Sequence, residues 1–450
     1  MSRAESTGEL AERGLRHGEG ETQVTVVRER SLLARFARSQ PTQATEIDDV
    51  TVSFLSLHDG HTGAAETNDL SDDALAAAAR RAAAAARAAA RAAGAPGDYP
   101  GLPEPAEPSG HDGFDPETAR LDPGSAGAQL RAAFGACAER GLQAFGIWTV
   151  GCVDTAIATT AGARLREEVT DGYMKVIARD EAGRSGWAAD ATSASGQLDG
   201  AALARRAAAK VGPGEPVDLA PGEYPVVLEP DAVGWLLDLL GYLAFNGLSH
   251  TEGRGALAGR LGTRVAAPAI NLSDSPRFAG TLPRAFDAEG VSKAPIPLIQ
   301  DGVAHAVVHD SRSAAHAGDG ARSTGHALVP GGAPYGPHPT NLVLIGGGAA
   351  DEHELAAPIE RGLYVTRLWY VNVVHEKSTL LTGMTRNGTY LIEDGRITRP
   401  VKDLRFTQSM LEALSGTEAV GSGSKLQASG ELFGCSRVPA LRLRAFTFSS

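Results

Sequence analysis

Histidine is the residue type in this chain best suited to hold a metal ion or to move a proton near neutral pH. The chain contains 12 histidines, and eight of them lie in its second half: His250, His305, His309, His316, His326, His338, His353 and His375. His305 and His309 are four residues apart, a spacing that would place two ligands on one face of a helix. We expect a strand here, in which that spacing separates two residues by about 13 Å. A metal ion shared by this pair is therefore not expected.

His375-Glu376 is half of a zinc-peptidase motif, but no second histidine follows it within one helical turn. The sequence also contains no Gly-x-x-x-x-Gly-Lys-Ser/Thr loop and no Gly-x-Ser-x-Gly elbow. Serine, histidine and aspartate are all frequent, so composition does not identify a catalytic triad. The residues alone thus predict no complete metal or nucleophile site.

The segment over residues 229–246, which begins Glu-Pro-Asp-Ala-Val-Gly-Trp-Leu-Leu-Asp, has apolar residues on every side of a helix. Pro230 suits a first helical turn, and Asp231 would then lie at the positive end of the helix dipole. The run is too short for a membrane span and contains Asp238, so we predict a buried core helix. Asp238 and Tyr242, four residues apart, share one face. The simplest role for Asp238 is a carboxylate paired inside the core.

The composition is that of a soluble globular protein, and a length of 450 residues predicts two domains. The net charge of −12 argues against nucleic acid as a partner, because phosphate binding needs a basic surface. The N-terminus has no signal-peptide pattern, and no apolar run reaches the roughly 20 residues of a membrane span. The three cysteines suggest a reducing compartment and no disulfide framework. We therefore expect a cytoplasmic protein.

The first half combines strands with alanine-rich helices. We predict strands over residues 24–27, 31–36 and 50–57 from their apolar alternation. A helix is predicted over residues 72–93, with Ser71 as its N-cap and Gly94 at its end. Further expected features are a flexible N-terminus over 1–22, a Pro/Gly-rich loop over 95–127, and additional strands and Ala-rich helices that end near 217.

Residues 218–450 have a different texture, with many short apolar segments separated by glycine and proline. Asp301-Gly302 and Asp394-Gly395 are typical hairpin turns. We therefore predict an α+β protein with an N-terminal α/β-type domain over 23–217. The predicted C-terminal domain over 218–450 is mainly antiparallel and barrel-like, and it surrounds the buried helix.

Several segments of the second half occur in an order and spacing typical of one family. They are Phe-Asp-Ala-Glu-Gly-Val at 286–291, the turn at 301–302, Ser-Thr-Gly-His-Ala at 323–327, the hairpin over 388–401, and Cys-Ser-Arg-Val-Pro at 435–439. Together they resemble the TldD/TldE (PmbA) family of bacterial metallopeptidase-related proteins. The similarity covers most of residues 23–450 and is specific after about residue 220.

In this family the TldD-type subunit carries His-Glu-x-x-x-His on the core helix and a later cysteine as a further zinc ligand. The corresponding positions here are Leu237, Asp238 and Tyr242, with Gly241 kept. Leucine cannot bind zinc and tyrosine rarely does, so the chain resembles the TldE (PmbA) type, which lacks the motif. The resemblance implies no catalytic residue and no metal ligand in this chain, Cys435 included. Zinc would be held by a TldD-type partner.

The resemblance further implies that the chain completes a chamber around the partner's zinc in a heterodimer, without nucleic acid or membrane. The implied substrate is an unfolded or modified peptide, or a small amide in a biosynthetic pathway, and strand edges could hold a peptide by β-augmentation. The candidate chamber residues are His250, Glu252, His326 and His375. Two alternatives stay open: a stand-alone amide or peptide hydrolase with a site relocated to these residues and Glu376, and a homodimer that binds peptide or metabolite without turnover.

Overall fold

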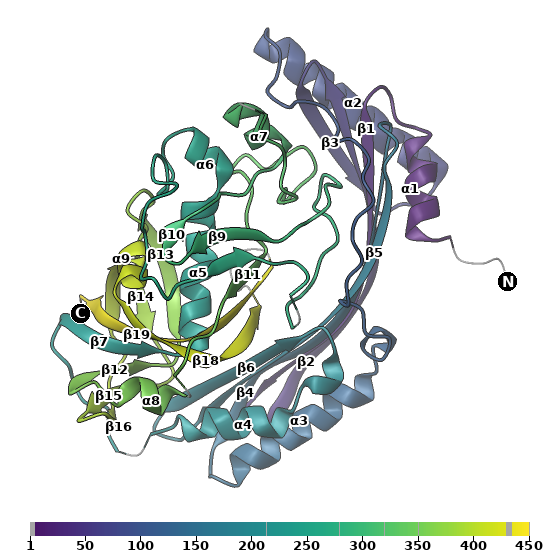
Figure 1. Ribbon diagram of the computed structural model, residues 1–450. Helices are drawn as coiled ribbons and strands as arrows, with labels where there is room; N and C mark the ends of the chain where they lie inside the picture. Colours follow the sequence, from purple (N-terminus) through teal and green to yellow (C-terminus); the bar gives the residue numbers. More distant parts are fainter. Residues whose placement is uncertain are drawn as a thin grey trace.

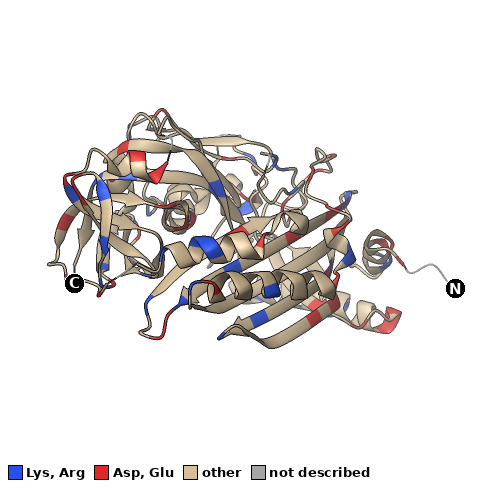
Figure 2. Cartoon of the chain, turned by 90° about the horizontal axis from the view of Figure 1, so that it is seen from below, with Lys and Arg blue, Asp and Glu red and all other residues tan. Residues whose placement is uncertain are grey.

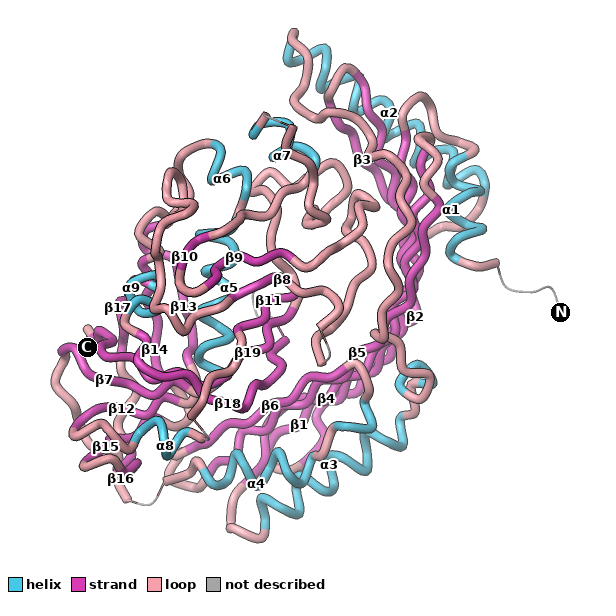
Figure 3. Tube along the Cα trace, viewed as in Figure 1, coloured by secondary structure: helices cyan, strands magenta, loops and turns pink. Residues whose placement is uncertain are grey.

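The computed structural model describes residues 5–212, 214–278, 280–318, 320–349, 351–428 and 434–449. These residues form two β-sheets, one of six strands and one of thirteen. In Figure 1 the six-stranded sheet is a long curved wall that faces the second sheet, and helices α2, α3 and α4 lie on its outer side. Figure 3 shows loops crossing the space between the two sheets. The predicted α+β class is confirmed.

The six-stranded sheet is antiparallel throughout and has the order β3-β2-β1-β4-β5-β6. Its strands are β1 (Thr22–Ala37), β2 (Gln40–His58), β3 (His61–Thr67), β4 (Gln143–Thr159), β5 (Arg164–Arg179) and β6 (Ser185–Thr192). The strands predicted over 24–27 and 31–36 are one strand, because the polar residues between them pair with both β2 and β4. The mixture of helices and strands predicted for this half is therefore a set of helices packed on an antiparallel sheet.

Four helices cover the outer face of this sheet: α1 (Thr7–Leu15), α2 (Asp72–Ala93), α3 (Pro123–Ala138) and α4 (Gly200–Ala209). Alternate residues of each strand point toward them. Met174 and Val176 of β5 are buried in one cluster with α3 and α4, and Val24 and Phe54 are buried in another with α1 and α2. The intervening residues of the strands consequently face the second half of the chain.

The prediction of a flexible N-terminus over residues 1–22 is wrong for Thr7–Leu15, which form α1. Ser6 caps this helix in a capping box with Glu9, and Leu10 is buried against the sheet. The apolar residues of so short a helix give a weak periodic signal, which is why the sequence did not reveal it. Residues 1–4 lie outside the described residues.

The thirteen-stranded sheet contains all strands from β7 onward. They are β7 (Gly222–Leu228), β8 (Leu272–Asp274), β9 (Ile296–Gln300), β10 (Val303–Ala304), β11 (Asn341–Leu344), β12 (Arg361–Val365), β13 (Leu368–His375), β14 (Leu380–Thr385), β15 (Thr389–Glu393), β16 (Arg396–Pro400), β17 (Arg405–Ser409), β18 (Thr417–Ala428) and β19 (Cys435–Phe448). The short helices of this half are α6 (Gly247–Thr251), α7 (Ser311–Ala317), α8 (Glu352–Ala356) and α9 (Met410–Ser415).

Most pairs in this sheet are antiparallel, as predicted, but β7–β12 and β11–β19 are parallel. The main path runs from β10 to β16; β13, β14 and β17 form a branch that joins it at β19, and β18 pairs separately with β19. Because the described path has two free ends, the sheet curves around its core without the closure that a barrel requires. The strand expected to contain His305 and His309 is wrong for both residues, since β10 ends at Ala304.

Helix α5 (Pro230–Phe245) is the predicted core helix, and Figure 1 shows it surrounded by the strands of the second sheet. Leu237, Leu240 and Phe245 are buried in the large apolar core of this half. Pro230 occupies the first turn, and the helix ends where Asn246 becomes extended. Within the described residues we find no helix with both the length and the apolar character needed to cross a membrane.

Polar contacts connect the two halves. Lys210 after α4 forms an ion pair with Glu229 before α5, with 2.5 Å between Nζ and Oε2. Arg284 lies 3.2 Å from Glu167 of β5, and Gln23 of β1 donates a hydrogen bond to the carbonyl of Ala288. The predicted boundary at 217/218 lies between α4 and β7.

Candidate functional site

A cavity of about 260 Å³ lies between the two halves, next to the first turns of α5. We call it the α5 cleft. Tyr173, Lys175 and Trp187 come from the six-stranded sheet; Asp231, Gly234, Trp235 and Asp238 come from α5; and Arg367, Trp369, Gln427, Ala428 and Ser436 come from the second sheet and its loops. Segments that are far apart in the sequence thus form one site.

The strand alternation of β5 explains why this sheet contributes polar residues to the cleft. Met174 and Val176 point to the helices, so Tyr173 and Lys175 point to the opposite face. On the other side of the cleft, the pairing of β13 with β14 is irregular between Trp369 and Asn372. Such bulges change the direction of a side chain, and this one lies beside Trp369, which lines the cleft.

The guanidinium of Arg367 lies over two indole rings. Its guanidinium carbon lies 3.8 Å from the ring centre of Trp187 and 4.7 Å from that of Trp369. Lys175 Nζ lies 5.5 Å from the ring centre of Trp187, and the guanidinium of Arg386 lies 6.0 Å from that of Trp369. We refer to these five residues as the cation–aromatic group. Cation–π contacts of this kind stabilise charges that are partly removed from water.

The cations of this group are poorly solvated. Arg367 is only 6% exposed, and burial lowers its pKa to about 10. Burial, followed by the charge of Arg367, also lowers the pKa of Lys175. Within the described part of the chain, no carboxylate oxygen lies within 4.0 Å of a charged nitrogen of Lys175, Arg367 or Arg386. The cleft therefore carries positive charge that the protein does not pair directly.

The two acids of α5 in the cleft are already engaged. Asp231 Oδ2 lies 2.8 Å from Lys425 Nζ; although burial would raise the pKa of Asp231, the charges of Lys425 and Lys210 lower it. Asp238 Oδ1 lies 3.7 Å from His338 Nε2. The expectation that Asp238 is a paired core carboxylate stays a prediction, because its 3.7 Å distance to His338 is longer than a hydrogen bond.

The positions that correspond to zinc ligands do not converge. Leu237 is 2% exposed and points into the apolar core with Met410 and Leu441, whereas Tyr242 is half-buried on another face of α5. A leucine in the core and a tyrosine on a different face do not fit a zinc ion.

The other candidate residues lie in two places. On the surface, Arg254 links Glu252 and Glu376, with Nε 2.5 Å from Glu252 and Nη1 3.4 Å from Glu376. His250 is half-buried in α6, where burial lowers its pKa, and His375 at the end of β13 contacts Ser378 at 2.8 Å. None of these four candidates lines the α5 cleft.

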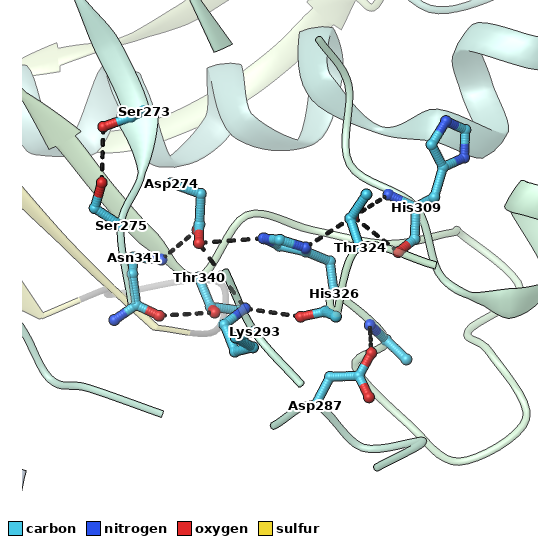
Figure 4. A network of polar contacts seen from close by, with 12 residues as sticks. Ser273, Asp274, Ser275, Asp287, Lys293, His309, Thr324, His326, Thr340 and Asn341 are labelled. Carbon is cyan, nitrogen blue, oxygen red and sulfur yellow. Dashed lines mark hydrogen bonds and ion pairs between the residues drawn. The ribbon is translucent and has the colours of Figure 1, made fainter. Parts of the chain in front are cut away.

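His326 is fully buried in a different network, shown in Figure 4. Its Nε2 lies 3.1 Å from Asp274 Oδ1, and its Nδ1 lies 3.0 Å from Thr324 Oγ1. Lys293 Nζ lies 3.9 Å from Asp274 Oδ1. Burial would raise the pKa of Asp274, but the charges of Lys293 and His326 lower it below its usual range.

This network borders a second cavity of about 640 Å³ between the halves, lined by His326, Lys293 and Asn341 among others. The backbone N–H of Asn341 donates to Asp274 Oδ2 at 2.7 Å, so the buried carboxylate holds β8 and β11 together. Cys435 is buried, and burial raises the pKa of its thiol. Across the described ranges, no three His, Cys, Asp or Glu side chains gather in a way that could hold a metal ion.

The cation–aromatic group was not predicted from the sequence. Lys175 and Trp187 are separated from Arg367 and Trp369 by about 180 positions, and neither pair forms a recognisable motif. The only local signal is the alternation of β5, which places Lys175 on the face away from the helices. Predicting the group would have required the packing of the two halves.

Family comparison defines the class of protein. Residues 221–450 match the PmbA/TldA metallopeptidase C-terminal domain, and residues 23–86 match PmbA/TldA metallopeptidase domain 1. The chain therefore belongs to the PmbA/TldA metallopeptidase family. The resemblance seen in the sequence is confirmed.

Particular relatives come from archaea and bacteria. A metalloprotease of Methanothermobacter thermautotrophicus is 27% identical over 206 residues, which are 46% of this chain and 44% of that protein. A metalloprotease TldD homologue of Haemophilus influenzae is 27% identical over 213 residues, 46% of this chain and 42% of that protein. The matched region thus spans less than half the length of these curated relatives.

Solved structures share the whole fold. TldE from Thermococcus kodakarensis superposes with a TM-score of 0.86 at 20% identity, covering 98% of this chain and 99% of that one. A Thermotoga maritima protein described as a modulator of a DNA gyrase superposes with a TM-score of 0.83 at 20% identity, with the same coverage. At this identity the likeness establishes the fold alone.

Proposed function

We propose that this chain is a non-catalytic subunit of the TldE (PmbA) type, which associates with a TldD-type zinc peptidase subunit and completes its substrate chamber. The observation that carries the proposal is the position of Leu237: the residue at the first ligand position of the family motif is part of the apolar core. In this proposal the zinc ion and its activated water belong to the partner, and this chain supplies binding surface.

An exposed strand edge supports association with a partner. Within the described part of the sheet, β13 pairs only with β14, so its other edge is open. Tyr370 is 73% exposed and Val374 is 53% exposed on this strand. Natural proteins usually cover or charge such edges, because an open apolar edge pairs readily with another chain.

The proposed substrates are unfolded or modified peptides, or small amides of a biosynthetic pathway. The α5 cleft and the adjoining cavity of about 670 Å³ share Lys175, Trp187, Arg367 and Trp369 as lining residues. Together these spaces could hold an extended chain of a few residues. In the view of Figure 2, lysines and arginines are interspersed with acids, which gives no support for a nucleic-acid partner.

A stand-alone hydrolase receives less support from the candidate residues. Arg254 holds both Glu252 and Glu376, which leaves these carboxylates ill placed to act as a base or as metal ligands. His326 is committed to the buried network with Asp274. A homodimeric binding protein remains the second alternative, and the open edge of β13 is also consistent with it.

The test is to purify this chain alone and together with a TldD-type chain that has an intact His-Glu-x-x-x-His motif, and to measure zinc content, association and cleavage of an unfolded peptide. We expect zinc and cleavage only in the mixture. Val374→Lys should weaken association by about tenfold or more, because it places a charge at the apolar edge. Ile47→Lys is the matched control, since Ile47 is 40% exposed on β2.

Other outcomes contradict the proposal. Stoichiometric zinc and cleavage by the chain alone would establish a stand-alone enzyme. A stable homodimer that binds peptide, with no cleavage in any mixture, would establish a binding protein.

A further inference from the structure

The α5 cleft contains a buried arginine whose hydrogen-bonding capacity is not used. Arg367 Nη1 donates to Asn387 Oδ1 at 3.1 Å, and Asn387 in turn donates to Ser185 at 2.8 Å. Arg367 Nε is buried and has no hydrogen-bond partner among the described residues. A buried donor without a partner costs free energy, so a ligand in the cavity that supplies an acceptor would be bound favourably.

The contacts that Arg367 already makes limit which of its donors can bind an acceptor. Trp187 and Trp369 lie against the guanidinium at 3.8 and 4.7 Å from their ring centres. Hydrogen bonds to a guanidinium lie in its plane, and Nη1 is already held by Asn387. Nε and Nη2 have no hydrogen-bond partner among the described residues, and together they form a two-donor fork that matches the two oxygens of a carboxylate.

The charge balance of the cleft favours the same ligand. Lys175 and Arg367 line the cleft and Arg386 lines the adjoining cavity, whereas the acids of the cleft are Asp231, which is paired with Lys425, and Asp238, which lies 3.7 Å from His338. Asp403 lines the adjoining cavity together with Arg386, and the charge of Arg386 opposes the rise in the pKa of Asp403 that burial causes. This excess of positive charge is local, since the whole chain has a net charge of −12. A ligand carboxylate would pair with the remaining charge.

We infer that the cation–aromatic group is a carboxylate-binding subsite for a peptide or amide ligand, with Arg367 as the bidentate donor, Lys175 as a second cation, and the indole rings as walls for the adjacent apolar atoms. The inner cavity of about 260 Å³ suits one terminal residue, and the adjoining cavity of about 670 Å³ accommodates the chain that leads to it. The inference deepens the proposed function by naming the substrate class, and its use in turnover rests on that proposal.

Binding can be tested on the isolated full-length chain, so that failure to associate with a partner does not affect the result. The probes are N-acetyl-Ala-Ala-Phe with a free carboxylate, the same peptide as a C-terminal amide, and N-acetyl-Ala-Glu-Ala amide. Calorimetry gives the affinities, and a change in tryptophan fluorescence reports occupancy of the cleft, which three of the four tryptophans line. We expect at least one anionic peptide to bind roughly tenfold or more tightly than the neutral amide. Comparing the affinities of the two anionic peptides shows whether the subsite binds a C-terminal carboxylate or a side-chain carboxylate.

Three variants examine the roles of the residues. Arg367→Gln should remove most of the preference for the anionic peptide, and Arg367→Lys should restore only part of it, because lysine lacks the planar fork. Lys175→Gln should weaken binding without disturbing the indole stack. Arg399→Gln is the control, since Arg399 is an exposed arginine paired with Glu393 on the surface.

Thermal unfolding of each variant separates loss of binding from loss of fold. The inference is overturned if the neutral and anionic peptides bind equally, if none binds at millimolar concentration, or if Lys175→Gln and Arg367→Lys bind the anionic peptide as tightly as Arg399→Gln does.

Discussion

Placing histidines at the two degenerate motif positions of α5 should not create a zinc site. In the variant Leu237→His/Tyr242→His, the first imidazole would enter the apolar core beside Met410 and Leu441. The second would lie on a different face of the helix. The side chains around Leu237 are apolar, so the first imidazole would find no further ligand there with which to hold an ion.

The cost of the substitution follows from the surroundings of Leu237. Its side chain is 2% exposed, so replacing it removes about 2 kcal/mol of apolar burial. The imidazole adds about 1–3 kcal/mol for a polar group without a hydrogen-bond partner. The free energy of unfolding should therefore fall by about 3–5 kcal/mol, which is a large fraction of the stability of an ordinary domain.

The assay combines denaturant unfolding with elemental analysis for zinc on the purified double variant. Leu261→His is the matched control, because Leu261 is 38% exposed and the same change should cost little there. One zinc ion per chain with unchanged stability would refute the reasoning and would mean that α5 can present both positions to one centre.

Two further predictions concern stability. Burial and the nearby charge of Asp287 raise the pKa of Glu289, so the folded state favours the protonated acid; the free energy of unfolding should fall as the pH rises above the ordinary glutamate pKa of 4.5. Glu289→Gln should flatten this decline in chemical denaturation between pH 5 and 9, and parallel profiles for variant and parent would contradict the assignment. Gly63→Ala should cost about 3 kcal/mol or more, because its Cβ would lie 2.2 Å from the backbone nitrogen of Ala86 in α2. Gly8→Ala, with no atom within 4 Å of the new Cβ in α1, should be neutral or slightly stabilising; equal unfolding midpoints for the two variants would show that α2 can move away.

Local signals predicted several elements well. Helix α2 has the predicted bounds of residues 72–93, with Ser71 as its N-cap and Gly94 in the left-handed conformation. Here the caps and the helix propensity agree, so no tertiary information is needed. The core helix α5 was equally clear, since a helix that is apolar all round can only be buried.

The sequence did not predict elements and contacts that form only against a distant part of the same chain. The first half of β2, over residues 40–49, is polar and exposed, and it is a strand because β1 pairs with it along its length. The exposed aromatic Tyr370 has a positive φ of 55° in an irregular strand, which no sequence pattern indicates. The cation–aromatic group likewise exists only when the two sheets face each other. The periodicity of apolar residues predicts a single helix or strand, whereas these features arise from the contact between two strands or two sheets.

One carboxylate joins three remote stretches of the chain. Glu229 precedes α5, is bound by Lys210 after α4, and accepts a hydrogen bond from the hydroxyl of Tyr364 in β12. The contacts of Glu229 that connect the two halves therefore lie at the N-terminal end of α5, the helix that lines the cleft. A substitution of Glu229 would therefore change both the contacts between the two halves and the geometry of the cleft.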